Sequence, residues 1–69
     1  MFVVDICLKQ IIQERGISER ELSRRTGIRQ PTINAMCNNQ SSSIPLKNLA
    51  NICGILECDI SDVLKLRNA

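Results

Sequence analysis

Residues 17–39, ISERELSRRTGIRQPTINAMCNN, have the pattern of two short helices joined by a tight turn. Ser18 and Glu21 form a capping box, in which the hydroxyl accepts from the N3 amide and the carboxylate returns to the cap amide. Gly27 ends this helix, because a residue without a Cβ enters the left-handed region at little cost. The pattern predicts a helix-turn-helix over about residues 18–38, with its second helix at about 30–38.

Apolar residues in this segment predict how the two helices pack. Ile17 and Leu22 can close a hydrophobic staple, and Ile33 and Met36 continue an i, i+3 stripe on the second helix. Helices that cross steeply need a small side chain at their closest approach, and Ser23 supplies one. An ordinary helical hairpin with no role in nucleic-acid binding would need the same residues, so packing alone leaves the function open.

Six positions of the segment resemble the helix-turn-helix of Cro and cI type repressors, the lambda-repressor-like DNA-binding family. They are Leu22, Ser23, Gly27, Ile28, Ile33 and Met36. The resemblance extends from about Leu8 to Leu64, and the stretch LANICGILECDISDVL is similar to the end of short stand-alone members. It implies an all-α fold of five helices and a sequence-specific DNA-binding transcriptional regulator, with the second helix of the motif in the major groove.

Residues before the motif predict one further helix. It would begin near Asp5, a competent cap, and end at Gly16. The side chains expected to point inward from this region are Val4, Leu8, Ile11 and Ile12. The opening MFVV is the only strand candidate, and it is too short to judge.

Residues after the motif predict two more helices. Pro45 opens the first, from Leu46 to about Leu56. Its apolar stripe consists of Leu49, Ile52, Cys53 and Leu56. Asp59 and Asp62 cap a last helix. The residues it would bury are Ile60, Val63 and Leu64. The chain, residues 1–69, is therefore predicted to be a single all-α domain.

The length of the chain predicts self-association. A domain of 69 residues with one aromatic side chain, Phe2, has a small aliphatic core that is marginal alone. Both ends are apolar, with Phe2 and Val3 near the start and Leu66 near the end. We expect a homodimer that uses the last helix and the N-terminal residues, with its two recognition helices about one DNA turn, ~34 Å, apart on a pseudo-palindromic site.

No segment predicts contact with a membrane. Lys9 and Gln10 interrupt the apolar run from Ile6 to Ile12, which falls well short of the ~20 residues of a transmembrane helix. The start, MFVVDICLK, lacks the basic residues and the cleavage site of a secretory signal. A cytoplasmic protein is expected.

The four cysteines do not have the spacing of a metal site, because the sequence contains neither a CxxC pair nor a histidine. Cys53 and Cys58 are expected in the core. Cys7 and Cys37 are expected to be partly exposed, which leaves a redox role open for either thiol. We expect no metal and no cofactor.

Residues for catalysis are also missing. Histidine, the commonest general base, is absent, and no glycine-rich phosphate loop occurs. The carboxylates near helix starts are explained as cap or first-turn residues, namely Glu19, Glu21, Asp59 and Asp62. The sequence therefore predicts no enzyme, and its length leaves no room for a domain that binds a small-molecule effector.

Charge is concentrated in and around the first helix of the motif. Five arginines between Arg15 and Arg29 oppose Glu19 and Glu21, a local balance of +3 within a net charge of +2. Arg24 and Arg25 are expected on a solvated face, because this helix usually presents only its N-terminal end to DNA. Arg29 lies at the start of the recognition helix, where it could reach a phosphate or a guanine edge.

The resemblance implies a set of DNA contacts at the start and on the outer face of the recognition helix, at the start of the preceding helix and in the following loop. Carried over to this chain, these residues are Arg29, Gln30, Pro31, Thr32, Asn34, Ala35, Asn38, Ser18, Glu19, Ser41 and Ser42. Gln and Asn amides can form a pair of hydrogen bonds with adenine, and Ala35 or Pro31 can pack against a thymine methyl. The loop residues from Asn39 to Ser43 can donate hydrogen bonds to phosphate oxygens. Gln30 is the strongest candidate for base readout.

Glu19 departs from the family pattern, which usually has Gln at this position. A carboxylate beside a phosphate repels it, so either the contact is lost or Glu19 turns towards a local arginine. The acidic residue also favours a rival function, an antitoxin-like or adaptor module that keeps the fold and binds a protein instead of DNA.

Overall fold

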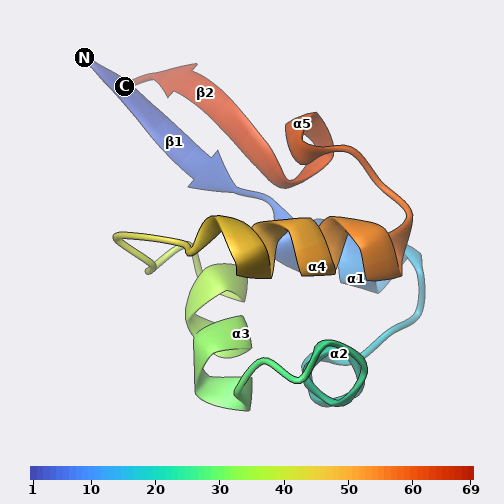
Figure 1. The fold of residues 1–69 in the computed structure, drawn as a ribbon. Coiled ribbons are helices and arrows are strands. Elements are labelled where there is room, and N and C mark those ends of the chain that lie inside the picture. The colour runs from blue at the N-terminus through green and yellow to red at the C-terminus, as the bar shows by residue number, and fades with distance from the viewer.

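Five helices and two short strands make up the chain, and the computed structural model describes residues 1–69 (Figure 1). In chain order they are β1 (Phe2–Ile6), α1 (Leu8–Glu14), α2 (Glu19–Thr26), α3 (Gln30–Cys37), α4 (Leu46–Leu56), α5 (Ile60–Val63) and β2 (Leu64–Asn68). Helices α2 and α3 lie at one end of the molecule, and the two strands lie together at the other, with both termini at its tip. None of the helices is both long and apolar enough to cross a membrane.

The helix-turn-helix forms where its local signals predict it. The Ser18 hydroxyl accepts from the Glu21 amide at 3.0 Å, and Gly27 ends α2 at a φ of 76°. Only half of the predicted capping box is present, because the Glu21 carboxylate contacts Arg24 and Arg25 instead of the cap amide. A complete box occurs instead at α5, between Asp59 and Asp62.

A single aliphatic core holds the helices together. It contains thirteen buried residues, with Leu22, Ile33 and Ile52 fully inaccessible. Helix α4 has the predicted bounds and buries Leu49, Ile52 and Leu56 from its apolar stripe. The apolar residues whose spacing predicted the helices are therefore the residues that pack the helix-turn-helix against the rest of the domain.

The all-α prediction was wrong at both ends of the chain, which pair as an antiparallel two-stranded sheet. Val4 lies opposite Leu66, and Ile6 lies opposite Leu64. Asp5 is a strand residue, not a helix cap, and Arg67 on the other strand donates to its carboxylate at 2.7 Å. This contact keeps the pKa of Asp5 below its ordinary value. Alternating side chains and β-branched residues suit a strand, but only the distant partner decides between strand and helix.

The strands also change which residues are buried. Helix α1 begins at Leu8, and Val4, expected to point inward, is 56 % exposed on β1. Helix α5 is a single turn, and its first residue, Ile60, is 53 % exposed instead of buried. Val63 is fully buried and Leu64 packs against the core, as predicted.

The cysteines were only partly predicted. Cys7 is half-buried and therefore partly exposed, as expected, and Cys53 and Cys58 are half-buried beside the core. Cys37 was expected to be partly exposed, but α3 turns it inward and it is buried.

Replacing Gly27 with alanine should destabilise the fold by about 1 kcal/mol, because the residue has a φ of 76° while no atom lies within 4 Å of the added Cβ. The matched control is Gly54→Ala in α4, where the new Cβ also has free space and no unusual φ. That change should stabilise the fold by roughly 0.5–1 kcal/mol. Urea unfolding of both variants measures the difference, and equal effects would refute the conformational account of Gly27.

Candidate nucleic-acid interface

Helix α3 has one buried face and one exposed face. Ile33, Met36 and Cys37 are in the core. The predicted contact residues Gln30, Pro31, Thr32, Asn34 and Asn38 are exposed, and Ala35 is half-buried. The exposed face therefore carries amide, hydroxyl and proline groups on a helix fixed from behind, which is the composition needed to contact base edges.

A shallow hollow on this face is lined by Gln30, Pro31 and Asn34. Pro31 is in the first turn of α3, where its missing N–H costs no helical hydrogen bond. The hollow brings together the first residue of the helix and a residue one turn later. Gln30 and Asn34 were both predicted for base readout, and the structure brings them onto the same surface.

Glu19 contacts the recognition helix directly. Its Oε1 accepts from Asn34 Nδ2 at 3.0 Å, and Asn34 Oδ1 accepts from Asn38 Nδ2 at 3.2 Å. Glu19 is half-buried and makes no ion pair. The sequence left two alternatives for Glu19, a lost phosphate contact or a turn towards a local arginine. The second prediction is wrong, because the carboxylate faces an amide of α3.

The charge of the Glu19 carboxylate also affects the pKa of the Cys37 thiol. Burial raises the pKa of Cys37 to about 11, and the nearby negative charge of Glu19 contributes to the rise, whereas Lys9 opposes it. A buried thiol with a raised pKa is poorly suited to redox sensing, because the thiolate is the reactive form. Glu19 thus faces α3, with its hydrogen bond going to Asn34.

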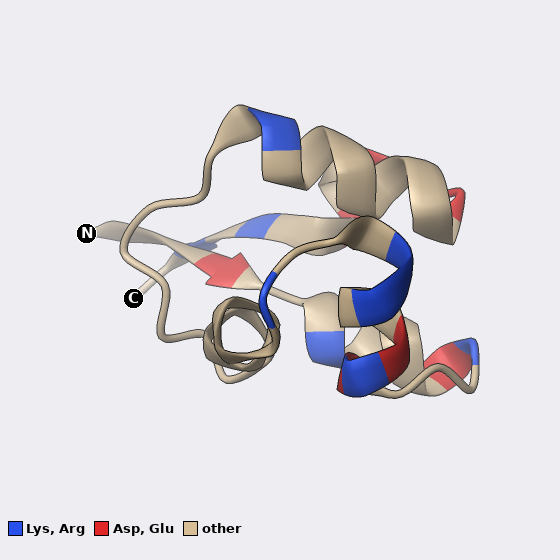
Figure 2. Ribbon diagram, turned by 60° about the horizontal axis from the view of Figure 1, so that its bottom comes forward, with Lys and Arg blue, Asp and Glu red and all other residues tan.

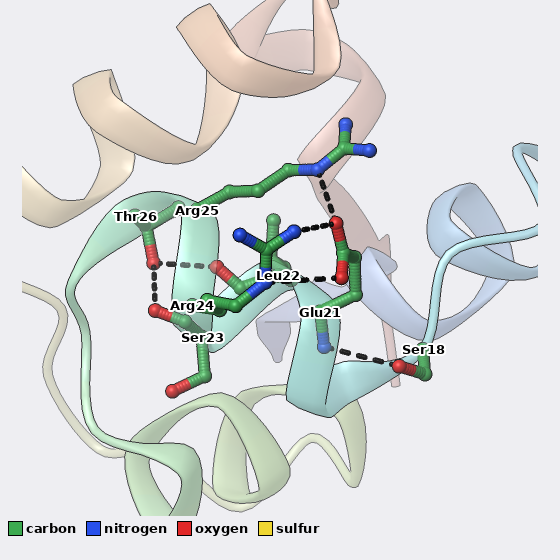
Figure 3. Close-up of polar contacts among 7 residues, drawn as sticks. All are labelled: Ser18, Glu21, Leu22, Ser23, Arg24, Arg25 and Thr26. Atoms are coloured by element: carbon green, nitrogen blue, oxygen red, sulfur yellow. Dashed lines mark hydrogen bonds and ion pairs between the residues drawn. The ribbon is translucent and has the colours of Figure 1, made fainter.

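The arginines of α2 are largely paired within their own helix. Arg24 and Arg25 contact the Glu21 carboxylate at 2.6 and 2.7 Å, as Figure 3 shows. The hydrogen bonds from Arg24 and then Arg25 keep the pKa of Glu21 below its ordinary value. These two arginines form an exposed local cluster, consistent with the solvated face predicted for them.

Arg29 is the cation that stands at the recognition helix. It is the exposed N-cap residue of α3 and has no acidic partner within 4 Å. Figure 2 shows the basic segment that precedes α3, and α3 itself without a charged residue. A free guanidinium at this place could contact a phosphate or a guanine.

Hydrogen bonds that sequence reasoning did not predict hold α3 at its angle to the rest of the domain. Ser23 donates from Oγ to the Ile28 carbonyl, so the small residue at the close approach also closes the turn. Thr26 donates to the Leu22 carbonyl at 2.8 Å (Figure 3) and accepts from the Ile28 amide at 3.2 Å. Asn51 of α4 donates to the Thr26 carbonyl at 2.8 Å.

Asn39, expected among the loop donors for phosphate, is exposed, but its side chain is hydrogen-bonded to β1. It has a φ of 57°, its Oδ1 accepts from the Ile6 amide at 2.9 Å, and its Nδ2 donates to Asp5 at 3.2 Å. The contact fastens the end of α3 to β1. Ser41 and Ser42 line a groove beside β1, with Ser41 half-buried and Ser42 exposed. Ser18 is exposed while its hydroxyl caps α2.

No three of the cysteine, aspartate and glutamate side chains lie together in an arrangement that could hold a metal ion. No buried side-chain nitrogen or oxygen is left without a hydrogen-bond partner. The polar groups that remain free are on the surface, and those of α3 form the candidate interface.

Comparison with known proteins agrees with this geometry. A family model described as the Cro/C1-type HTH DNA-binding domain matches residues 7–68. An uncharacterized HTH-type transcriptional regulator of Bacillus subtilis (strain 168), YozG, is 34% identical over 58 residues, which cover 84% of this chain and 69% of that protein.

Two crystal structures have a similar fold. A proposed DNA-binding protein from Bacteroides fragilis is 22% identical with a TM-score of 0.81, covering 91% of this chain and 100% of its own. The transcriptional regulator VanUg is 23% identical with a TM-score of 0.79, covering 99% of this chain and 89% of its own. The family match, which includes the complete helix-turn-helix, confirms the resemblance seen in the sequence: the chain belongs to the Cro/C1-type helix-turn-helix DNA-binding domains.

Proposed function

We propose that this chain is a sequence-specific DNA-binding transcriptional regulator that inserts α3 into the major groove. The observation that carries the proposal is the exposed face of α3, whose polar side chains are anchored from behind by Ile33 and Met36 and preceded by the unpaired Arg29. Membership of the family and a relative named as a transcriptional regulator support it. We propose no catalytic function, cofactor or small-molecule effector.

The exposed residues of α3 take different roles in this proposal. Gln30 reads a base edge, Thr32 and Asn38 add hydrogen bonds, and Pro31 or Ala35 packs against a thymine methyl. Arg29 contacts a phosphate or a guanine edge. Ser18, Ser41 and Ser42 contact the DNA backbone and set the register without specifying sequence.

We further propose that the protein acts as a homodimer in the cytoplasm and regulates by occupying its site, as a repressor would. The apolar face of the terminal sheet supports self-association, because Phe2, Val4 and Leu66 are exposed on strands whose free ends lie opposite α2 in the molecule. An isolated two-stranded sheet is marginally stable in water, so covering this face with a second copy would add burial. Two recognition helices would then meet half-sites ~34 Å apart.

Selection from a pool of random duplexes, at low and at physiological salt, tests this function. We expect a selected sequence and a shallow dependence of affinity on salt, because log affinity falls by about 0.9 per log salt for each phosphate neutralised and few free cations border α3. A steep slope would mean that more arginines contact DNA than Arg29 and its neighbours.

The rival function, a protein-interaction module, is favoured by one observation: the acidic Glu19 occupies the end of α2 that usually meets DNA. A folded, dimeric protein that binds no duplex even at low salt would support the rival. Binding without any sequence preference would contradict the proposed regulator as well.

Gln30→Ala should change the selected sequence, whereas Ser42→Ala should weaken binding evenly across sequences. Loss of a base-reading amide costs about 1–3 kcal/mol at one base position. Both residues are exposed, so neither change should affect folding. Binding isotherms on selected and scrambled duplexes separate the two effects. If Gln30→Ala weakens both duplexes equally, Gln30 does not read a base.

A further inference from the structure

The contact between Glu19 and Asn34 fixes the orientation of an amide on the recognition helix. A carboxylate can only accept hydrogen bonds, so the group that faces Glu19 Oε1 at 3.0 Å is the amino group of Asn34. Asn34 Oδ1 must then face the other way, where Asn38 Nδ2 donates to it at 3.2 Å. The negative charge of Glu19 thus fixes the orientation of both side-chain amides: the amino group of Asn34 faces Glu19, and the amino group of Asn38 faces the oxygen of Asn34.

This order limits what the two amides can offer to DNA. Asn34 has one N–H left after its bond to Glu19, and its oxygen is already engaged by Asn38. The bidentate reading of adenine would therefore have to use the second lone pair of an oxygen that already accepts from Asn38, whereas one N–H of Asn34 is not shared with any other group. The unshared group that Asn34 presents is a donor, which suits a base edge that carries a major-groove acceptor, such as guanine, thymine or N7 of adenine, and opposes the amino group of cytosine.

We propose that Glu19 is a specificity-determining positioning residue: by holding the amino group of Asn34, it selects an acceptor-bearing base opposite Asn34. The inference rests on the proposed DNA binding. This positioning role differs from simple charge repulsion, because a carboxylate that only repels phosphates would weaken binding to every DNA sequence alike. The hydrogen bond to Asn34, without an ion pair to any arginine, also separates Glu19 from the arginine cluster of α2.

Glu19→Gln is the test, since glutamine keeps the shape but can donate as well as accept. Asn34 can then turn over, and Asn38 with it. In wild type we expect one base position per half-site to favour guanine or thymine over cytosine by roughly fivefold to tenfold, and in Glu19→Gln this preference should shrink to below about twofold. The control is Glu14→Gln, which removes the same charge from an exposed carboxylate on α1 and should leave the preference unchanged.

Combining Glu19→Gln with Asn34→Ala distinguishes positioning from charge. If Glu19 acts through Asn34, its substitution has no further effect on base preference once the amide is absent. Nitrogen-15 spectra of the free protein add a readout that needs no DNA, because the side-chain amide signals of Asn34 and Asn38 should move in Glu19→Gln and not in Glu14→Gln.

A uniform gain in affinity for all duplexes in Glu19→Gln, with the base preference intact, would overturn the inference in favour of repulsion. An unchanged preference and unchanged amide signals would overturn it too. Both outcomes require a wild-type protein that selects a sequence. A wild type that selects none contradicts the proposed function instead, and the amide signals still report whether Glu19 holds Asn34.

Discussion

Ile33→Ala is expected to remove a large part of the protein's free energy of unfolding. The side chain is fully buried between the recognition helix and the core, and its truncation removes packed methyl groups and leaves a cavity. Such changes cost about 2–5 kcal/mol. A chain of this length has a total stability of roughly 3–10 kcal/mol, so the loss is a large part of the whole. Urea denaturation followed by circular dichroism measures it.

The matched control is the neighbouring Thr32→Ala. Thr32 is exposed on the same helix, so its loss should leave the urea midpoint nearly unchanged and affect only DNA binding. An Ile33→Ala protein as stable as wild type would mean that α3 is not anchored through this residue. The claim that α3 holds its exposed polar side chains in a fixed position would then be contradicted.

A Phe2→Asp, Leu66→Asp double variant is expected to be monomeric and to bind its site far more weakly. Phe2 is 66 % exposed and Leu66 is 70 % exposed, and the face of the sheet that carries them continues into a groove beside α4. Two carboxylates placed there would oppose a dimer through desolvation. Losing the second recognition helix removes the gain from bivalent binding, which is of the order of 10²-fold or more.

Sedimentation equilibrium at tens of micromolar tests the assembly, with Ile60→Asp as control. Ile60 is also an exposed apolar residue, but it begins α5, where an acidic side chain suits the helix start. We expect a dimer for wild type and for the control, and a monomer for the double variant. A monomeric wild type, or a double variant that still dimerises, rules out the sheet as the interface.

The sequence was sufficient for the helix-turn-helix and for α4 because their signals are local. Ser18, Gly27 and Pro45 act on residues within one turn, and the structure has the predicted helix boundaries there. The strands could not be predicted in the same way. Val4 and Leu66 are partners across almost the whole chain, and a short alternating segment has no strand geometry until that partner is present.

The candidate site was predicted in composition but not in its connections. The residues expected on the outer face of α3 are exposed there, except Ala35, which is half-buried. The contact between Glu19 and Asn34 depends on the angle between α2 and α3, which Ser23, Thr26 and Asn51 fix through bonds to the backbone. Such angles follow from tertiary packing, and no spacing rule in the sequence reports them.

Substitution of single purines in the selected half-site by 7-deazapurines tests major-groove readout by α3 most directly, since it removes one acceptor from the groove and leaves pairing intact. For at least one purine, we predict that the substitution weakens DNA binding by the wild-type protein by about tenfold. The same substitution should leave the affinity of the Gln30→Ala protein unchanged. If every substitution weakens both proteins equally, or only 3-deazapurines in the minor groove have an effect, then α3 does not read DNA as proposed.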